Sequence, residues 1–153
     1  MTEFAFYKTS NFRVDETFYV LVQKALEKNL NSVVIFETKE ALKDISIMLW
    51  SKKPETFLPH SIERDNLSND SPIYLTTREE NPNKSQIIFS PEGALVKKSK
   101  NWKRCIYIFD HDDNSSFDRL KEYYFLLENS KEKIELYEQN KGNWIKNNFM
   151  RQE

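Results

Sequence analysis

The sequence predicts an α/β fold in which helices flank a central, mostly parallel sheet. One observation is the order of patterns in the first third of the chain, where an aromatic run, a helical repeat, an apolar run and a second helical repeat follow one another. This alternation is typical of parallel strands joined by right-handed helical crossovers. A second observation is the run Val33-Val34-Ile35-Phe36, which is apolar throughout and rich in β-branched residues, as expected of a strand covered by helices on both faces.

The elements of the first third are predicted in order. The aromatic run Phe4–Tyr7 predicts a strand, because polar residues that favour a turn follow it. A helix is expected over residues 14–29, where apolar residues recur at helical spacing. After the apolar strand at 33–36, Thr38 can cap a second helix that continues to Trp50.

The middle of the chain is expected to be largely irregular and exposed. Pro54 and Pro59 mark a loop, and residues 65–71 are rich in Asn, Asp and Ser. Strands are expected to resume at Ile73–Leu75 and Ile87–Phe89, with a polar loop between them.

Three further elements are predicted in the last third. The apolar run 104–109 predicts a buried strand, and the segment 94–100 before it is either a short helix or an irregular crossover. Asp113 or Asn114 can cap a helix. Its apolar face carries Phe117, Leu120, Tyr124 and Leu127. Residues 134–145 are expected to form a terminal hairpin.

Length and composition limit the classes of protein. The 153 residues fall in the range of one compact domain, so a single domain over 1–153 is expected, with a core rich in aromatic residues, which make up 14% of the chain. The 23 Lys and Arg nearly balance the 24 Asp and Glu, which disfavours a global positive field and hence direct binding of nucleic acid. Direct single-strand binding through exposed Trp, Tyr and Lys stays an alternative.

Cysteine, histidine and hydropathy patterns exclude other classes. Cys105 lies in the apolar run before Phe109, so a buried, unreactive thiol is expected. One Cys and two His cannot build a metal cluster, and no metal or cofactor is expected. Because the sequence has no signal-like amino terminus and no apolar run of roughly 18 residues, we expect a soluble cytoplasmic protein without membrane contact.

Candidate catalytic and nucleotide-binding patterns are weak. The chain has only two glycines, and the turn after the first strand has none, whereas phosphate-binding loops need several. The most enzyme-like cluster is Asp110-His111-Asp112-Asp113, at the end of a predicted buried strand where α/β active sites often lie. A solvated turn with capping acids explains the cluster more simply. A small α/β enzyme using Asp110–Asp113 stays an alternative.

The segment Leu49–His60 is the most distinctive in the chain. A helix ends in Leu-Trp, and a short polar loop closes in Glu-x-Phe-Leu-Pro-His. This stretch resembles the most recognisable part of the chi subunit family of bacterial DNA polymerase III. Shorter matches occur in the family's order and approximate spacing: Phe6-Tyr7, Val33–Ile35, Ser71–Thr76, Asn81–Asn83, Ile108–Asp110 and Gly142–Trp144. The resemblance covers essentially the whole chain, and Leu49–His60 is its specific part.

The resemblance implies a Rossmann-like fold without a nucleotide site, in agreement with the scarcity of glycine. It implies a non-catalytic adaptor in DNA replication with two partners and only indirect contact with nucleic acid. One partner is the psi subunit of the clamp loader, with which the chain would form a heterodimer where psi is present; without psi a monomer is expected. The other is the acidic carboxy-terminal tail of single-stranded-DNA-binding protein, which ends in an apolar residue and a free carboxylate.

The resemblance also implies where that tail binds. Lys121 falls where the family commonly has an arginine, Tyr124 falls on a family aromatic, and Trp50 matches a tryptophan that lines the apolar slot. Supporting charges are expected from Arg119, Lys52 and Lys53. The chain departs from the family at 123–125, where aromatic residues replace cations, and Lys in place of Arg loses the bidentate fork.

Phe57, Leu58, Pro59 and His60 form the second candidate site. The functional interpretation is that this apolar loop contacts a subunit, because leaving Phe57 exposed forgoes about 2 kcal/mol of burial. The alternative is a loop plug in which Phe57 and Leu58 fill a gap and His60 caps a backbone group.

Overall fold

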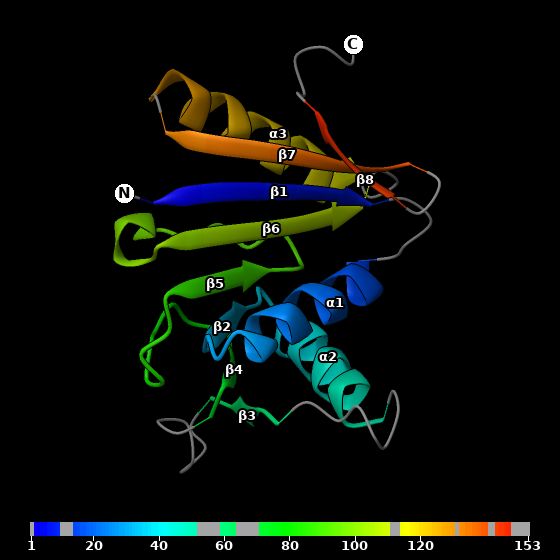
Figure 1. The fold of residues 1–153 in the computed structure, drawn as a ribbon, viewed down its shortest axis with the longest axis vertical. Coiled ribbons are helices and arrows are strands. Elements are labelled where there is room, and N and C mark those ends of the chain that lie inside the picture. Colours follow the sequence, from blue (N-terminus) through cyan, green and yellow to red (C-terminus); the bar gives the residue numbers. More distant parts are fainter. Residues whose placement is uncertain are drawn as a thin grey trace.

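The computed structural model describes residues 2–9, 14–51, 59–63, 71–110, 114–130, 132–140 and 143–147 of the chain. Two strand–helix pairs open it, the strands β3 to β6 follow, and α3 and a hairpin close it (Figure 1). In chain order the elements are β1 (Glu3–Thr9), α1 (Val14–Glu27), β2 (Ser32–Ile35), α2 (Lys39–Ser51), β3 (Ser61–Ile62), β4 (Ile73–Thr76), β5 (Ile87–Ser90), β6 (Arg104–Asp110), α3 (Asn114–Asn129), β7 (Lys133–Asn140) and β8 (Asn143–Asn147).

The strands form one eight-stranded sheet in the order β3-β4-β2-β5-β6-β1-β7-β8. All neighbouring strands are parallel except β7 and β8, which pair as an antiparallel hairpin. The predicted α/β class with a mostly parallel sheet is confirmed, as is the terminal hairpin. The short edge strand β3 was not predicted.

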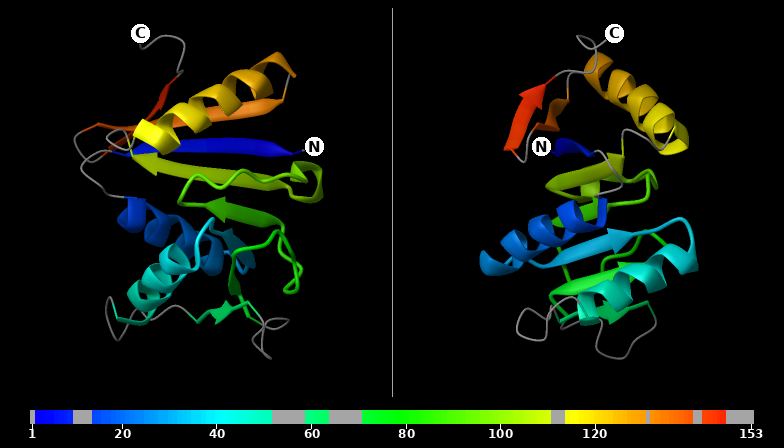
Figure 2. Two further views of the ribbon diagram at one scale, coloured as in Figure 1. Left: turned by 180° about the vertical axis from the view of Figure 1, so that it is seen from behind. Right: turned by 90° about the vertical axis from the view of Figure 1, so that its right-hand side faces the viewer.

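The two faces of the sheet are covered by different connections. The chain moves from β1 through α1 to β2 and through α2 to β3, and both helices pack on one face. It then returns through β5 and β6 to β7, so the connection before β6 and the helix α3 lie on the other face. Figure 2 shows α1 and α3 on opposite sides of the twisted sheet. The right-handed rule for parallel crossovers explains the change of face, since the chain reverses its direction across the sheet after the edge strand β3.

Each face has its own aromatic core. On the α3 face, the ring of Phe6 stacks on Tyr107 with centroids 5.1 Å apart. On the α1 face, the rings of Phe18 and Phe89 meet edge to face at 5.7 Å. Cys105 is fully buried, as predicted. Rings that are fully removed from water stabilise the fold by about 2 kcal/mol each, so these contacts hold the helices on the sheet.

The connection from β5 to β6 is an irregular crossover, with a single 3-10 turn at Ser99–Asn101, which decides between the two predicted alternatives. The hydroxyl of Ser90 donates to the carbonyl of Ala94 at 2.6 Å, and the backbone N–H of Val96 donates to the hydroxyl of Tyr107 at 3.1 Å. Side chains therefore supply the hydrogen bonds that a helix would have supplied here.

The amino ends of three strands are joined through one buried amide. The side chain of Asn83 donates to the carbonyls of Ser32 and Ser71 at 3.2 and 2.8 Å and accepts from the hydroxyl of Ser85 at 2.7 Å. These groups precede or begin β2, β4 and β5. The Asn-Pro-Asn sequence before β5 thus has a structural role.

Candidate functional site

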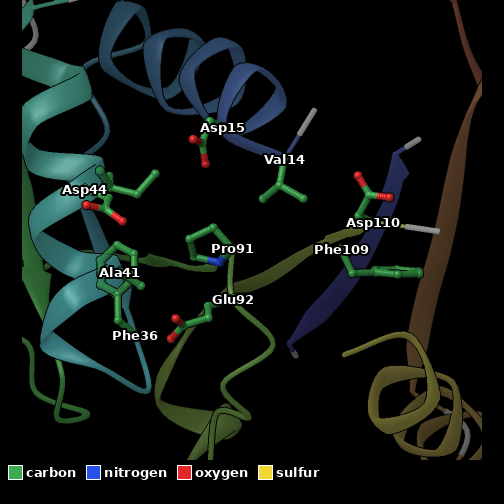
Figure 3. A pocket seen from close by; sticks show the side chains of 10 residues that line it. Val14, Asp15, Phe36, Ala41, Asp44, Pro91, Glu92, Phe109 and Asp110 are labelled. Carbon is green, nitrogen blue, oxygen red and sulfur yellow. The ribbon is translucent and has the colours of Figure 1, made fainter. Parts of the chain in front are cut away.

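A cavity of about 330 Å³ lies where β2, β5 and β6 end, and we call it the carboxyl-end pocket (Figure 3). Neighbouring strands send their connections to opposite faces here, which is where ligands bind in open α/β sheets. The pocket is lined by Val14, Asp15, Phe36, Ala41, Asp44, Ile45, Pro91, Glu92, Phe109 and Asp110. The fold therefore provides the usual location of an α/β ligand site.

The lining of the carboxyl-end pocket is acidic. Four of the described lining residues carry carboxylates: Asp15, Asp44, Glu92 and Asp110. The described lining contains no Lys or Arg. Nucleotide sites instead offer backbone N–H groups and cations to phosphate oxygens. The described lining is thus the reverse of a nucleotide site.

Glu92 has a structural partner at the start of α2. Its carboxylate accepts hydrogen bonds from the backbone N–H groups of Glu37 and Thr38, at 2.7 and 3.3 Å, and from the Thr38 hydroxyl at 3.2 Å. The Thr38 hydroxyl in turn accepts from the N–H of Ala41 at 3.1 Å, which confirms Thr38 as the cap. A carboxylate is favourable at the positive end of a helix dipole, so Glu92 fixes one wall of the pocket.

The Asp110–Asp113 cluster is only partly described. Asp110 is 3% exposed, ends β6 and lines the pocket. His111, Asp112 and Asp113 lie outside the described residues. Among the residues that are described, no group of three or more His, Cys, Asp or Glu could hold a metal ion.

Of the predicted tail-binding residues, Tyr124 belongs to the core. It is 4% exposed, and its ring meets that of Phe6 edge to face at 5.4 Å. Burial raises the pKa of its hydroxyl, with a smaller contribution from Glu128. Most of the Tyr124 side chain is therefore occupied by packing against β1.

The two candidate cations of α3 lie on opposite flanks of the helix, because residues two apart differ in direction by about 200°. Arg119 forms an ion pair with Glu37 and donates to the carbonyl of Gly93 at 3.2 Å. Lys121 is half-buried on the other flank. The structure thus separates these two cations.

Trp50 is the penultimate residue of α2, and its side chain lies outside the described part of the chain, as do Lys52 and Lys53. The helices α2 and α3 pack on opposite faces of the sheet, so Trp50 and Tyr124 belong to elements on different faces. The proximity of Trp50 to Lys121 stays a prediction.

The second candidate site is described at its end only. Phe57 and Leu58 lie outside the described residues. Pro59 is exposed, and His60 shares a hydrogen bond of 2.9 Å with the hydroxyl of Ser46, which is buried on α2. The loop is therefore anchored to α2 through its last residue.

Sequence reasoning missed the partners of Arg119. Glu37 and Gly93 stand far from Arg119 in sequence, and neither belongs to a local pattern. The two residues meet Arg119 because β2 and β5 end beside the first turns of α3. No single-sequence signal could have identified this contact.

None of the described helices combines the length and apolar character that crossing a membrane requires.

Comparisons with known proteins identify the family. The profile described as DNA polymerase III chi subunit, HolC, matches residues 1–133. A similar curated protein is the probable DNA polymerase III subunit chi of Rickettsia prowazekii (strain Madrid E), 29% identical over 157 residues that cover 95% of this chain and 92% of the relative. Domain 2 of the DEAD-box helicase Mss116p, solved bound to an RNA duplex, has a TM-score of 0.54 at 9% identity; the match covers 91% of this chain but only 65% of that chain, and it shows the fold alone. Since the profile matches most of its length, the protein belongs to the chi subunit family of DNA polymerase III, whose members are accessory subunits in DNA replication.

Proposed function

We propose that the protein is a non-catalytic adaptor that links the clamp loader to single-stranded-DNA-binding protein on DNA. The observation that carries this proposal is the family match over residues 1–133, which includes the Leu49–His60 segment and all of α3. The acidic tail of single-stranded-DNA-binding protein is proposed to bind beside α3, with Lys121 as the cation for its terminal carboxylate.

The position of Lys121 supports this role. Lys121 is half-buried, and a cation beside the low-dielectric protein surface attracts a carboxylate more strongly than a cation in bulk water at the same distance. As a point charge it gives less geometric selectivity than a bidentate guanidinium. We therefore expect salt-sensitive binding of modest affinity. Arg119 contributes only where a peptide displaces Glu37.

The psi subunit is proposed to bind through the Phe57–His60 loop. The support is the exposed Pro59 next to His60, which is anchored to α2 by Ser46. A hydrogen bond that already holds His60 reduces the conformational freedom that this residue loses on binding. Leu58→Glu should abolish co-purification with a co-expressed psi subunit, while Lys121→Glu should leave it intact. Retention of psi by Leu58→Glu would assign the psi contact to another surface.

The tail site is tested by titration with a synthetic acidic peptide that ends in Pro-Phe. Calorimetry at low and moderate salt should show saturable binding that weakens with salt and disappears when the terminal Phe is removed. Lys121→Glu should abolish binding and leave the melting temperature nearly unchanged. The matched control is Lys43→Glu, on the exposed side of α2, which makes the same change in net charge. Equal binding by both variants would refute the assignment of Lys121.

A second candidate function is favoured by the carboxyl-end pocket. A cavity of about 330 Å³ with Asp110 in its lining has the size and place of a small-molecule site in an α/β enzyme. Native mass spectrometry of the purified protein tests this alternative. A bound nucleotide, metabolite or metal that is lost in Asp110→Asn would support an enzyme, and a spectrum of the chain alone would count against one.

A further inference from the structure

The cations of this protein are unevenly distributed along the chain. Five of the 23 Lys and Arg fall in the eight residues Lys97–Arg104, and this segment contains no Asp or Glu. We call Lys97–Arg104 the basic crossover, because it ends the connection from β5 to β6. The near-neutral total charge conceals this local excess.

The backbone of the basic crossover is held in place by side chains from outside it. The carboxylate of Glu79 accepts from the backbone N–H groups of Lys97 and Lys98, at 2.7 and 3.0 Å, and from the indole N–H of Trp102 at 3.4 Å. The hydroxyl of Thr2 donates to the carbonyls of Ser99 and Trp102, at 3.0 and 2.8 Å. Trp102 itself is buried in the core on the α3 face. These hydrogen bonds and the burial of Trp102 thus hold the backbone of the basic crossover in one conformation.

The lysine side chains of the basic crossover are exposed to solvent. Lys97, Lys98, Lys100 and Lys103 are all exposed. Arg104 pairs with Glu3 at 3.8 Å, but none of the four ammonium groups forms an ion pair with any residue that the structure describes. Four exposed cations within seven residues, on a backbone held by hydrogen bonds, create a positive surface. The four ammonium groups repel one another, and a bound anion would relieve this repulsion.

The positive and negative surfaces lie at opposite ends of the parallel strands. The basic crossover leads into the first residue of β6 and lies beside the start of β1 (Figure 1), whereas the four carboxylates of the carboxyl-end pocket gather where the strands end (Figure 3). A net charge of −1 therefore hides a charge separation along the strands. A near-neutral net charge therefore does not exclude nucleic-acid binding at the amino ends of the strands.

We propose that Lys97, Lys98, Lys100 and Lys103 contact the phosphate backbone of nucleic acid without reading its sequence. Lysine binds phosphate as a point charge and needs no bidentate geometry. Trp102 is buried, so the crossover offers no ring on which a base could stack, and contact through phosphates is what remains. This contact is separate from the tail site on α3 and does not rest on the proposed adaptor function.

An acidic peptide fits this surface less well. The cavity beside Lys100, about 330 Å³ in volume, is lined by Thr2, Phe4, Ser99 and Glu132. The carboxylate of Glu132 would repel the terminal carboxylate of a peptide whose apolar side chain entered this cavity. Phosphates that follow the exposed lysines need not enter the cavity.

The salt dependence of binding gives a quantitative expectation. Each neutralised phosphate contributes about −0.9 to the log–log slope for duplex DNA and about −0.7 for a single strand, so four contacts predict slopes of about −3.6 and −2.8. Binding of a short fluorescent duplex should therefore weaken about a hundredfold between roughly 50 and 200 mM salt. Fluorescence anisotropy with this duplex and with labelled oligothymidine measures both slopes.

Two quadruple variants of the full chain distinguish local charge from net charge. In the first, Lys97, Lys98, Lys100 and Lys103 are changed to Gln. In the control, the exposed Lys24, Lys28, Lys39 and Lys43 are changed to Gln, which removes the same charge from the other face. At low salt the first variant should bind at least about tenfold more weakly with a slope near zero, and the control should stay within about twofold of the wild type. Both should melt near the wild-type temperature, because all eight side chains are exposed.

Three results would overturn the proposal. The first is no binding of duplex or oligothymidine by the wild type at low salt. The second is equal weakening in both variants, which would indicate a general charge effect. The third is that the first variant binds nucleic acid as the wild type does but no longer binds the acidic tail peptide. That result would make the basic crossover a protein-docking surface.

Discussion

Arg119 of α3 forms an ion pair with Glu37, the residue before the cap of α2, across the edge of the sheet. The same guanidinium donates to the carbonyl of Gly93, and the neighbouring Glu92 carboxylate holds the N–H of Glu37. The segment after β2, the segment after β5 and the start of α3 are thus joined at one point. The side chains of Arg119 and Glu37 are 42% and 39% exposed, so the ion pair itself is of modest strength.

This pair predicts how Glu37 affects the proposed tail binding. An acidic peptide that uses Arg119 must compete with the Glu37 carboxylate, so Glu37→Gln should raise its affinity. An exposed pair is worth about 0.2–1 kcal/mol, which corresponds to a gain of about 1.5- to fivefold by calorimetry. The control is Glu40→Gln, an exposed glutamate in the first turn of α2. Unchanged affinity in Glu37→Gln, with a wild type that binds, would show that the peptide does not use Arg119.

The amide of Asn83 predicts a large loss of stability. Asn83→Ala removes both donors to the carbonyls of Ser32 and Ser71 in a site that is 1% exposed. Leaving buried carbonyls without donors should lower the free energy of unfolding by about 3 kcal/mol, measured by urea denaturation. Asn101→Ala, at an exposed position, should change it by less than about 0.5 kcal/mol. Similar values for the two variants would contradict the structural role of Asn83.

Glu63 predicts a pH dependence. Burial of its carboxyl raises the pKa, but hydrogen bonds from the N–H and hydroxyl of Thr77 and from the hydroxyl of Thr76, together with the charge of Lys39, outweigh burial and hold the pKa below its ordinary value of 4.5. A lowered pKa contributes stability above the unfolded-state value, and this contribution is lost as the pH falls through the folded-state pKa. At neutral pH the free energy of unfolding of the wild type should exceed that of Glu63→Gln by about 1 kcal/mol.

The pH titration of that difference is the decisive measurement. Urea denaturation of the wild type and Glu63→Gln should give a constant difference above about pH 5.5 and a shrinking one below the ordinary value of 4.5. A difference that grows on acidification would mean that the carboxylate is destabilising in the folded state.

Cys105 should be inert in the folded protein. Its side chain is fully buried, and burial, with a smaller contribution from the charge of Glu79, raises the pKa of the thiol to about 12. An aromatic disulfide reagent at mildly alkaline pH should not label the native chain within minutes and should label one thiol in denaturant. Rapid labelling without denaturant would show that β6 opens locally.

Local patterns predicted the elements well. The apolar run at Val33–Phe36 became β2, Thr38 caps α2, and the predicted terminal hairpin pairs antiparallel. The predicted helix over 14–29 ends earlier, at Glu27, because Asn29 adopts a left-handed conformation with φ of 60°. The strand β3, at Ser61–Ile62, escaped prediction because pairing with β4 alone defines so short a strand.

The candidate site was less accessible to sequence reasoning. Lys121 and Arg119 were placed on one helix correctly, but the Glu37 and Gly93 partners of Arg119 depend on strand order. Strand order is set by long-range packing, and β1 and β2, consecutive in sequence, have β5 and β6 between them. No local pattern encodes that separation.

The sequence by itself determined most of the helices and strands and, through its resemblance to the chi subunit family, the class of protein. Only the tertiary structure decided which side chains meet, namely the four carboxylates of the carboxyl-end pocket and the pair of Arg119 with Glu37, and it placed the basic crossover at the opposite end of the strands. The physical reason is that periodicity acts within one element, whereas the meeting of distant side chains follows from crossover handedness and from burial of both faces of the sheet.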